Sequence, residues 1–73
     1  MPKVLISDKL SDAAVEIFRQ AGVEVDFRPE LGKDPAALAR VIGDYDGLAI
    51  RSATKVSADL LDHAKNLRVI GRA

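Results

Sequence analysis

The chain has 73 residues, of which 48% are hydrophobic, and its 11 lysines and arginines balance 11 aspartates and glutamates. A chain of this length forms one small globular unit, and its zero net charge provides no general attraction to nucleic acid or to an anionic membrane surface. The chain contains no cysteine, which excludes disulfides, thiolate metal sites and a cysteine nucleophile, and makes a reducing, cytoplasmic setting the default expectation.

The first third of the chain predicts a strand, a helix and a second strand. Residues 4–6 are an apolar run, typical of a central strand covered on both faces and far too short for a signal peptide or a membrane span. Apolar residues recur at helical spacing over residues 10–21, with Ser11 placed to cap the start of this helix and Gly22 placed to end it. Hydrophobic and charged residues alternate over 23–27, which indicates a strand at a sheet edge with one face exposed to solvent.

A second helix is expected in the middle of the chain. Residues 30–33 resemble a polar connection, after which Asp34 is suited to cap a helix and Pro35 to occupy its first position. Gly43 is placed to close this helix. Three residues of the helix are expected to face inward: Leu38, Val41 and Ile42.

The last third of the chain predicts a strand, a helix and a final strand. Residues 48–50 are apolar throughout, which favours an interior strand. Residues 58–65 predict a helix capped by Ser57, and Asn66 suits a left-handed exit from it. Residues 67–70 predict the fourth strand. The apolar face of the helix is expected to carry Leu60, Leu61 and Ala64.

Strands and helices alternate along the whole chain, which predicts an α/β fold with a parallel sheet and right-handed crossovers. We expect a flavodoxin-like arrangement of three layers with strand order 2-1-3-4. This order puts the second strand, which has a solvent-exposed face, at an edge, and the two most apolar strands in the middle. Since the sequence stops at Ala73, directly after a strand, where a further helix would normally cover the sheet, we expect an incomplete domain.

Basic and hydroxyl side chains follow the strands that should flank the reversal of strand order. In open parallel sheets, ligands bind beyond the carboxyl ends of the strands at this point, which here lies between the first and third strands. The loops 7–9 and 51–55 meet there, next to residues 71–72 at the end of the fourth strand. Paired nitrogens of arginine fit carboxylate or phosphate oxygens, so we expect a site for a small anion; the alternative is ordinary solvated loop charges. The candidate residues are Arg51, Ser52, Thr54, Lys55 and Arg72.

Other kinds of chemistry find less support in the sequence. His63, the one histidine, has no carboxylate or nucleophile placed to work with it and is interpreted as a helix surface residue. Asp8 invites comparison with the phosphorylated aspartate of receiver domains, but that residue ends the third strand, where this chain has Arg51. No GxGxxG segment follows a strand, so we expect no dinucleotide site. A metal site is not expected either.

Three segments of the chain resemble a known family: residues 4–8, residues 47–56 and residues 66–73. Together they are similar to the D-isomer-specific 2-hydroxyacid dehydrogenases, and the resemblance covers essentially the whole chain. It implies that residues 1–73 are the amino-terminal part of a substrate-binding domain, and that the NAD-binding domain and all catalytic residues lie beyond Ala73. The segment alone is then expected to be inactive.

Within this family the chain is most similar to the members that oxidise 3-phosphoglycerate to 3-phosphohydroxypyruvate with NAD in serine biosynthesis. The resemblance implies that Arg51 and Ser52 contact the substrate carboxylate or phosphate, and that Arg72 supplies a second positive charge. It also implies a homo-oligomeric parent enzyme, and the balanced charge leads us to expect no nucleic-acid or membrane partner. Two alternatives stay open: another 2-hydroxyacid dehydrogenase, of the glyoxylate or hydroxypyruvate reductase type, and a non-catalytic module that binds an anion or another protein.

Overall fold

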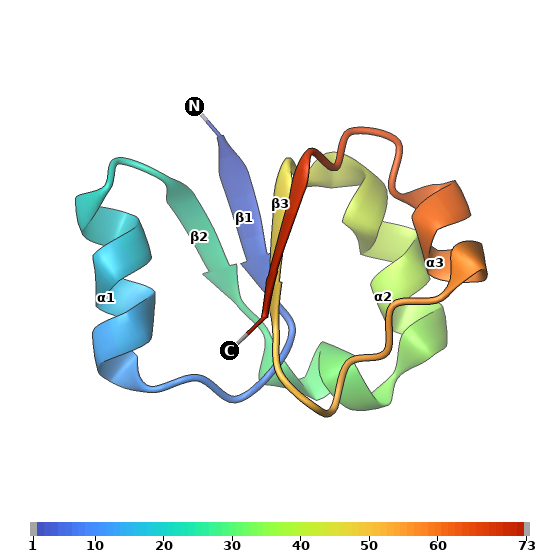
Figure 1. The fold of residues 1–73 in the computed structure, drawn as a ribbon, viewed down its shortest axis with the longest axis horizontal. Coiled ribbons are helices and arrows are strands. Elements are labelled where there is room, and N and C mark those ends of the chain that lie inside the picture. The colour runs from blue at the N-terminus through green and yellow to red at the C-terminus, as the bar shows by residue number, and fades with distance from the viewer. Residues whose placement is uncertain (1, 73) are drawn as a thin grey trace.

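The computed structural model describes residues 2–72 as a run of alternating strands and helices (Figure 1). Two short 3-10 helices, η1 and η2, flank the second α-helix. In chain order the elements are β1 (Lys3–Ile6), α1 (Asp12–Gln20), β2 (Glu24–Phe27), η1 (Pro29–Lys33), α2 (Pro35–Val41), η2 (Ile42–Asp44), β3 (Gly47–Ile50), α3 (Ala58–His63) and β4 (Val69–Arg72).

The four strands form one parallel sheet in the order β2-β1-β3-β4, which confirms the predicted fold class and strand order. Leu5 in β1 lies opposite Asp26 in β2 and Leu48 in β3. Because all the pairings are parallel, the carboxyl ends of the strands share one edge of the sheet, the lower edge in Figure 1. We call it the carboxyl edge. The loops that leave β1, β2 and β3 all start there.

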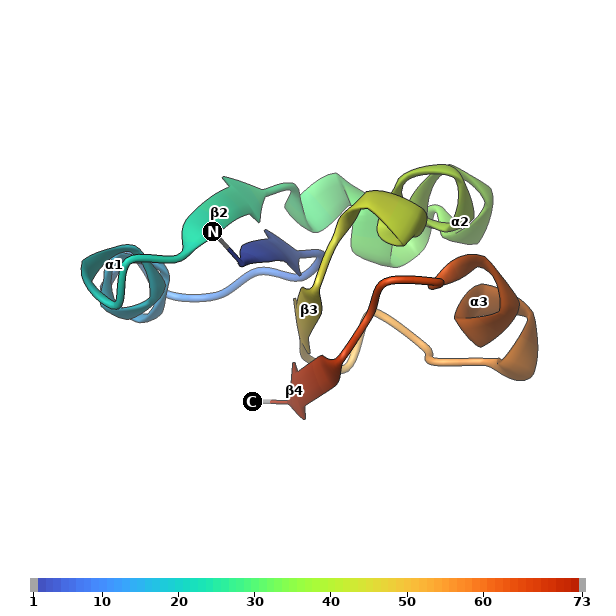
Figure 2. The same ribbon diagram turned by 90° about the horizontal axis from the view of Figure 1, so that it is seen from above.

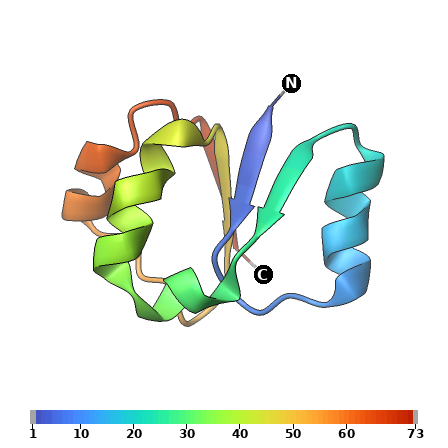
Figure 3. The same cartoon turned by 180° about the vertical axis from the view of Figure 1, so that it is seen from behind.

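Helices cover both faces of the sheet, which confirms the three layers. Helix α1 lies on one side, and α2 and α3 lie on the other (Figure 2); the view from behind shows the same division around β1 and β2 (Figure 3). Since alternate residues of a strand point to opposite faces, the core divides in two. The α1 side buries Val4, Ile6, Val15 and Ala49. The α2 and α3 side buries Leu5, Leu31, Leu38, Ile42, Tyr45, Leu48, Ile50 and Leu60.

Each predicted N-terminal helix cap is present. The side-chain oxygens of Ser11, Asp34 and Ser57 accept hydrogen bonds from backbone N–H groups three residues further on, at 3.1 to 3.2 Å. These bonds satisfy donors that have no partner inside the helix. Gly22 follows α1 with a φ of 79°, a left-handed conformation that glycine adopts without a steric penalty. The start of each α-helix could therefore be predicted from the sequence.

Several element ends differ from the prediction. The expected polar connection at residues 30–33 is the 3-10 helix η1, in which Leu31 and Gly32 are buried, because the apolar leucine packs into the core. Helix α2 ends at Val41, and Gly43 lies inside η2 rather than closing α2. Val41 itself is only partly buried.

The end of α3 was also predicted wrongly. The helix stops at His63, and Asn66 has no positive φ. Its side-chain amide donates to the carbonyl of Gly43 at 2.7 Å. A turn bond from the N–H of Leu67 to the carbonyl of Ala64 delays β4, which begins two residues later than expected. Leu61, expected on the apolar face, is 48% exposed.

Strand β4 is the least covered part of the sheet, with all four of its residues exposed. Val69 lies on the α1 side of the sheet, opposite Gly47, and is 62% exposed. Among residues 2–72, no helix has the length and apolar character needed to cross a membrane.

Candidate functional site

Three loops meet at the carboxyl edge: residues 7–11 after β1, residues 28–34 after β2 and residues 51–57 after β3. Two neighbouring hollows lie between them and share Lys33 and Ala53. The first, of about 370 Å³, is also lined by Asp8, Lys9, Pro29 and Glu30. The second, of about 470 Å³, is also lined by Leu31, Gly32, Pro35, Leu38, Thr54, Lys55 and Ser57. The carboxyl edge is therefore hollowed where ligands of open parallel sheets bind.

Arg51 stands at the point where the strand order reverses. It directly follows β3, and its Nη1 donates to the backbone carbonyl of Lys9, in the loop after β1, at 3.2 Å. The guanidinium therefore reaches across from one strand end to the other. Its remaining N–H donors form no hydrogen bond within residues 2–72, and the side chain is exposed. Arginine in such a place can bind an anion with a pair of hydrogen bonds.

A buried polar group ties the β1 and β3 loops together. We call Ser7, Asp8 and Thr54 the Asp8 cluster; these residues are 0%, 2% and 6% exposed. One carboxylate oxygen of Asp8, Oδ2, accepts the backbone N–H of Arg51 at 2.6 Å and that of Thr54 at 3.0 Å. The hydroxyls of Ser7 and Thr54 lie 2.8 Å apart, and the Thr54 hydroxyl also bonds the Ser7 carbonyl at 3.2 Å.

These contacts decide the charge of Asp8. Burial alone would raise the pKa of this carboxyl group. The N–H of Arg51, the side chain and N–H of Thr54 and the N–H of Ala53 outweigh burial and lower its pKa below the usual value of 3.8. Asp8 is therefore an ionised carboxylate, held by donors from the β3 loop.

Gly32 allows η1 to pack directly on this cluster. A Cβ atom at this position would overlap the backbone carbonyl oxygen of Ser7, and would lie 3.0 Å from Oγ1 of Thr54 and 3.1 Å from Oδ1 of Asp8. Any other residue would push η1 away from the cluster, so the close contact of all three loops depends on glycine here.

The carboxyl edge is positively charged although the chain is neutral overall. Its loops and the end of β4 carry six cationic side chains and three carboxylates. Each carboxylate is engaged within the fold: Asp8 as above, Glu30 with Arg28 at 3.0 Å, and Asp34 as the cap of α2. The six cations are Lys9, Arg28, Lys33, Arg51, Lys55 and Arg72. The local anion preference expected from the sequence therefore has a structural basis.

The predicted site residues occupy different positions at this edge. Ser52 is exposed beside Arg51, and Lys55 is exposed in the hollow that also contains Lys33. Arg72 ends β4 opposite Ile50, the residue before Arg51, so the two arginines stand at neighbouring strand ends. Their contact with a ligand stays a prediction.

The structure gives Thr54 a different role from the one predicted. The sequence made its hydroxyl a candidate donor to the anion. In the structure, the Thr54 hydroxyl bonds Ser7, and the N–H groups of Arg51 and Thr54 bond Asp8. Since these donors are already used inside the fold, we leave them out of the anion site.

Other groups singled out in the sequence lie apart from the carboxyl edge or lack partners. His63 ends α3, where its Nδ1 lies 2.8 Å from the carbonyl oxygen of Asp59, and it is exposed. Within residues 2–72, no three histidine or carboxylate side chains gather as metal ligands would. The loops 7–11 and 51–57 contain no glycine, so they do not fit a dinucleotide phosphate, and we assign no NAD contact to this chain.

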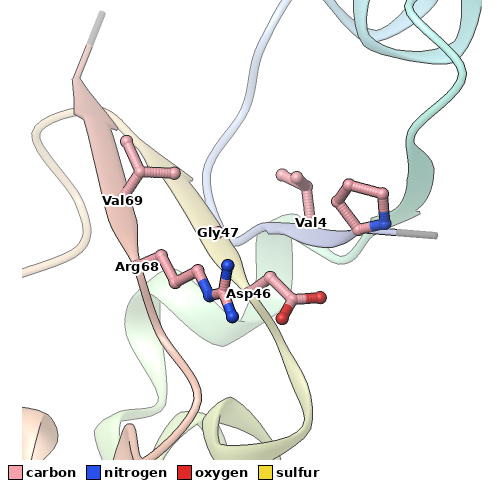
Figure 4. A pocket seen from close by; sticks show the side chains of 6 residues that line it. Val4, Asp46, Gly47, Arg68 and Val69 are labelled. Atoms are coloured by element: carbon pink, nitrogen blue, oxygen red, sulfur yellow. The ribbon is translucent and has the colours of Figure 1, made fainter.

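A further hollow lies at the opposite, amino edge of the sheet. It is lined by Arg68 and Asp46, together with Val4, Gly47 and Val69 (Figure 4). The connections at this edge, residues 42–46 and 64–68, carry two carboxylates and two basic side chains. The balanced charge gives no preference for an anion, and the amino ends of parallel strands are not the usual place for ligands. The carboxyl edge is the better candidate.

Sequence reasoning missed three parts of the site. Asp8 was considered only as a phosphorylation site, Gly32 as part of a connection, and Lys33 not as a lining residue. A glycine within an apolar Leu31–Gly32 pair could have suggested close packing. The partners of Asp8 could not have been found in this way, because they lie 43 and 46 residues away.

Known proteins match this chain over nearly all of its length. Curated D-3-phosphoglycerate dehydrogenases from Sus scrofa and Archaeoglobus fulgidus are 44% and 37% identical to it, each over 97% of the chain. The enzyme of that name from Methanocaldococcus jannaschii is 41% identical over the full chain. In each case the chain spans only 13% of the relative's length.

Solved structures share the fold. A Pyrococcus horikoshii protein superposes with a TM-score of 0.88 at 28% identity, covering 99% of this chain and 21% of that one. A Thermus thermophilus protein gives a TM-score of 0.81 at 28% identity, covering 96% and 22%. The sequence model described as "D-isomer specific 2-hydroxyacid dehydrogenase, catalytic domain" matches residues 4–73. The chain therefore belongs to the D-isomer specific 2-hydroxyacid dehydrogenase family.

Proposed function

We propose that the protein containing this chain oxidises 3-phosphoglycerate to 3-phosphohydroxypyruvate, and that the carboxyl edge described above forms one wall of its substrate site. The observation that carries this proposal is the position of Arg51, whose guanidinium bridges the ends of β1 and β3. The similarity to three enzymes named D-3-phosphoglycerate dehydrogenase supports the choice of substrate.

The proposed substrate suits the charges at this edge. 3-Phosphoglycerate carries a carboxylate and a phosphate, and arginine and lysine bind both groups. Arg51 would take one anionic end with paired hydrogen bonds, and Ser52 would add a hydroxyl donor. Arg72 and Lys55 would supply the remaining positive charge. Fixing both ends orients the hydroxyl-bearing carbon, which is how positioning of a substrate raises the rate.

The oxidant and the wider setting belong to the same proposal. We infer that NAD is the oxidant and is held by a part of the protein outside residues 1–73, and that the enzyme serves serine biosynthesis in the cytoplasm as a homo-oligomer. The chain described here contributes substrate binding and no catalytic residue, so by itself it should be inactive.

Replacing Arg51 tests the site. In the full-length protein, Arg51→Ala should raise the KM for 3-phosphoglycerate with a smaller effect on kcat, because it removes an interaction made in both ground and transition states. Arg51→Lys keeps the charge but loses the planar pair of donors, and should lie between alanine and the wild type. A matched control is Arg68→Ala, an arginine in the amino-edge hollow. Equal KM values for Arg51→Ala and the wild type would refute the proposed site.

A second candidate function is a non-catalytic module that binds an anion or another protein. The exposure of all four residues of β4 favours it, since uncovered apolar strand surface promotes association. Sedimentation of the chain with and without 3-phosphoglycerate separates the two candidates. Self-association that does not depend on the ligand would favour the module.

A further inference from the structure

We propose that Asp8 is the positioning residue of the anion site, holding the loop of residues 51–54 in the shape that presents Arg51 to the substrate. This inference rests on the proposed function and adds a role that the family resemblance did not assign. Asp8 itself would not touch the substrate.

The first support is the geometry of the carboxylate. Its Oδ2 receives two backbone N–H groups of the same loop, those of Arg51 and Thr54, at 2.6 and 3.0 Å. Two bonds to one fixed atom set the path of the loop between them. Because one of the bonds is to the N–H of Arg51 itself, it fixes the backbone from which the guanidinium extends.

The second support is the residue that follows Asp8. The backbone carbonyl of Lys9 accepts a hydrogen bond from Nη1 of Arg51 at 3.2 Å. Asp8 and Lys9 therefore hold Arg51 at both ends, one by its backbone and the other by its side chain. A shift of the β1 loop would move the arginine with it.

A carboxylate next to an anion site opposes the binding of an anion, so the two possible roles of Asp8 predict opposite effects of its removal. If Asp8 acted only as an opposing charge, its removal would strengthen substrate binding. A charged acceptor holds N–H groups more strongly than a neutral one, so a positioning role predicts the reverse, weaker binding. Asp8 is 2% exposed and also lines the first hollow, so the direction of the change in KM decides between the two roles.

The test compares Asp8→Asn and Asp8→Ala in the full-length protein. Asparagine keeps an oxygen that can accept the same N–H groups but loses the charge, whereas alanine loses both. We expect KM for 3-phosphoglycerate to rise moderately with asparagine. With alanine it should rise further, on the order of tenfold to a hundredfold, as expected for a displacement of about 1 Å. The kcat should change less than KM in both variants.

Two controls separate positioning from general stability. Asp46→Asn removes the charge of a matched carboxylate, one that accepts the backbone N–H of Lys3 at 2.9 Å but belongs to the amino edge, and it should leave KM unchanged. The double variant Asp8→Asn with Arg51→Ala should have a KM close to that of Arg51→Ala alone, because Asp8 acts through Arg51 and its loop. Full additivity of the two effects on KM would overturn the inference.

The outcomes distinguish this inference from the proposed function. If Arg51→Ala raises KM but Asp8→Asn leaves it unchanged or lowers it, Asp8 is not a positioning residue and the anion site stands. If Arg51→Ala leaves KM unchanged, the proposed site fails and the role of Asp8 fails with it. Should Asp8→Ala not fold, the isosteric Asp8→Asn variant decides on the same criteria.

Discussion

Replacing Thr54 with valine tests whether its hydroxyl serves the fold or a ligand. Valine has nearly the same shape but no hydroxyl, so it removes the contacts at 2.8 Å to the Ser7 hydroxyl and at 3.2 Å to the Ser7 carbonyl. Ser7 is fully buried. In the part of the chain that the structure describes, every buried side-chain polar atom has a partner. The substitution would leave the Ser7 hydroxyl without one.

The size of the effect follows from this contact. An unpaired buried hydroxyl costs about 1–3 kcal/mol of stability, whereas removing both partners together is nearly neutral. Thr54→Val should therefore lower the free energy of unfolding by about 1–3 kcal/mol. Adding Ser7→Ala should restore only part of that loss, because the Ser7 carbonyl still lacks the Thr54 hydroxyl. Thr54→Ser, which keeps the hydroxyl, should cost only about 0.8 kcal/mol for the lost methyl group.

Urea unfolding of the wild type, Thr54→Val, Ser7→Ala and the double variant forms a double-mutant cycle that measures these differences, with Thr54→Ser measured beside it. KM for 3-phosphoglycerate, measured in the full-length protein, gives the second readout. If Thr54 binds the substrate instead, Thr54→Val should raise KM with no loss of stability, and Ser7→Ala should not reverse the change. That pattern would refute the structural role and restore the role predicted from the sequence.

Two further predictions concern pH and a turn. Because the pKa of Asp8 is lowered in the fold, its contribution to stability is complete above its unfolded pKa, near 3.8, and is lost as pH falls through the folded value. The free energy of unfolding of Asp8→Asn, measured with urea at a series of pH values, should therefore fall less steeply toward acid pH than that of the wild type. An equally steep fall would contradict this. Gly22→Ala should lower the free energy of unfolding by about 1–2 kcal/mol, because φ is 79° and the added Cβ meets nothing within 4 Å, so the cost comes from the left-handed backbone alone. Gly22→Asn should cost less. An alanine variant as stable as the wild type in urea would show that the backbone conformation carries no such cost.

The sequence alone determined the order of elements, the helix starts and the strand order. Ser11, Asp34 and Ser57 bond N–H groups only three residues away, so these caps depend on local sequence. The sheet order followed from hydrophobic pattern, because the apolar run at residues 48–50 needs cover on both sides while the alternating run at 23–27 does not. The location of Arg51 followed from that order.

Only the tertiary structure decided how the site is built. Asp8 and Thr54 are 46 residues apart in sequence, and neither residue type indicates its partner. The sequence therefore left the donors of the loop at residues 51–55 open to a ligand, whereas the fold uses several of them for Asp8 and Ser7. The sequence also gave no indication that Gly32 contacts the Asp8 cluster. Local pattern specifies elements and their exposed faces, but hydrogen bonds between loops form only after parallel strands bring their carboxyl ends to one edge.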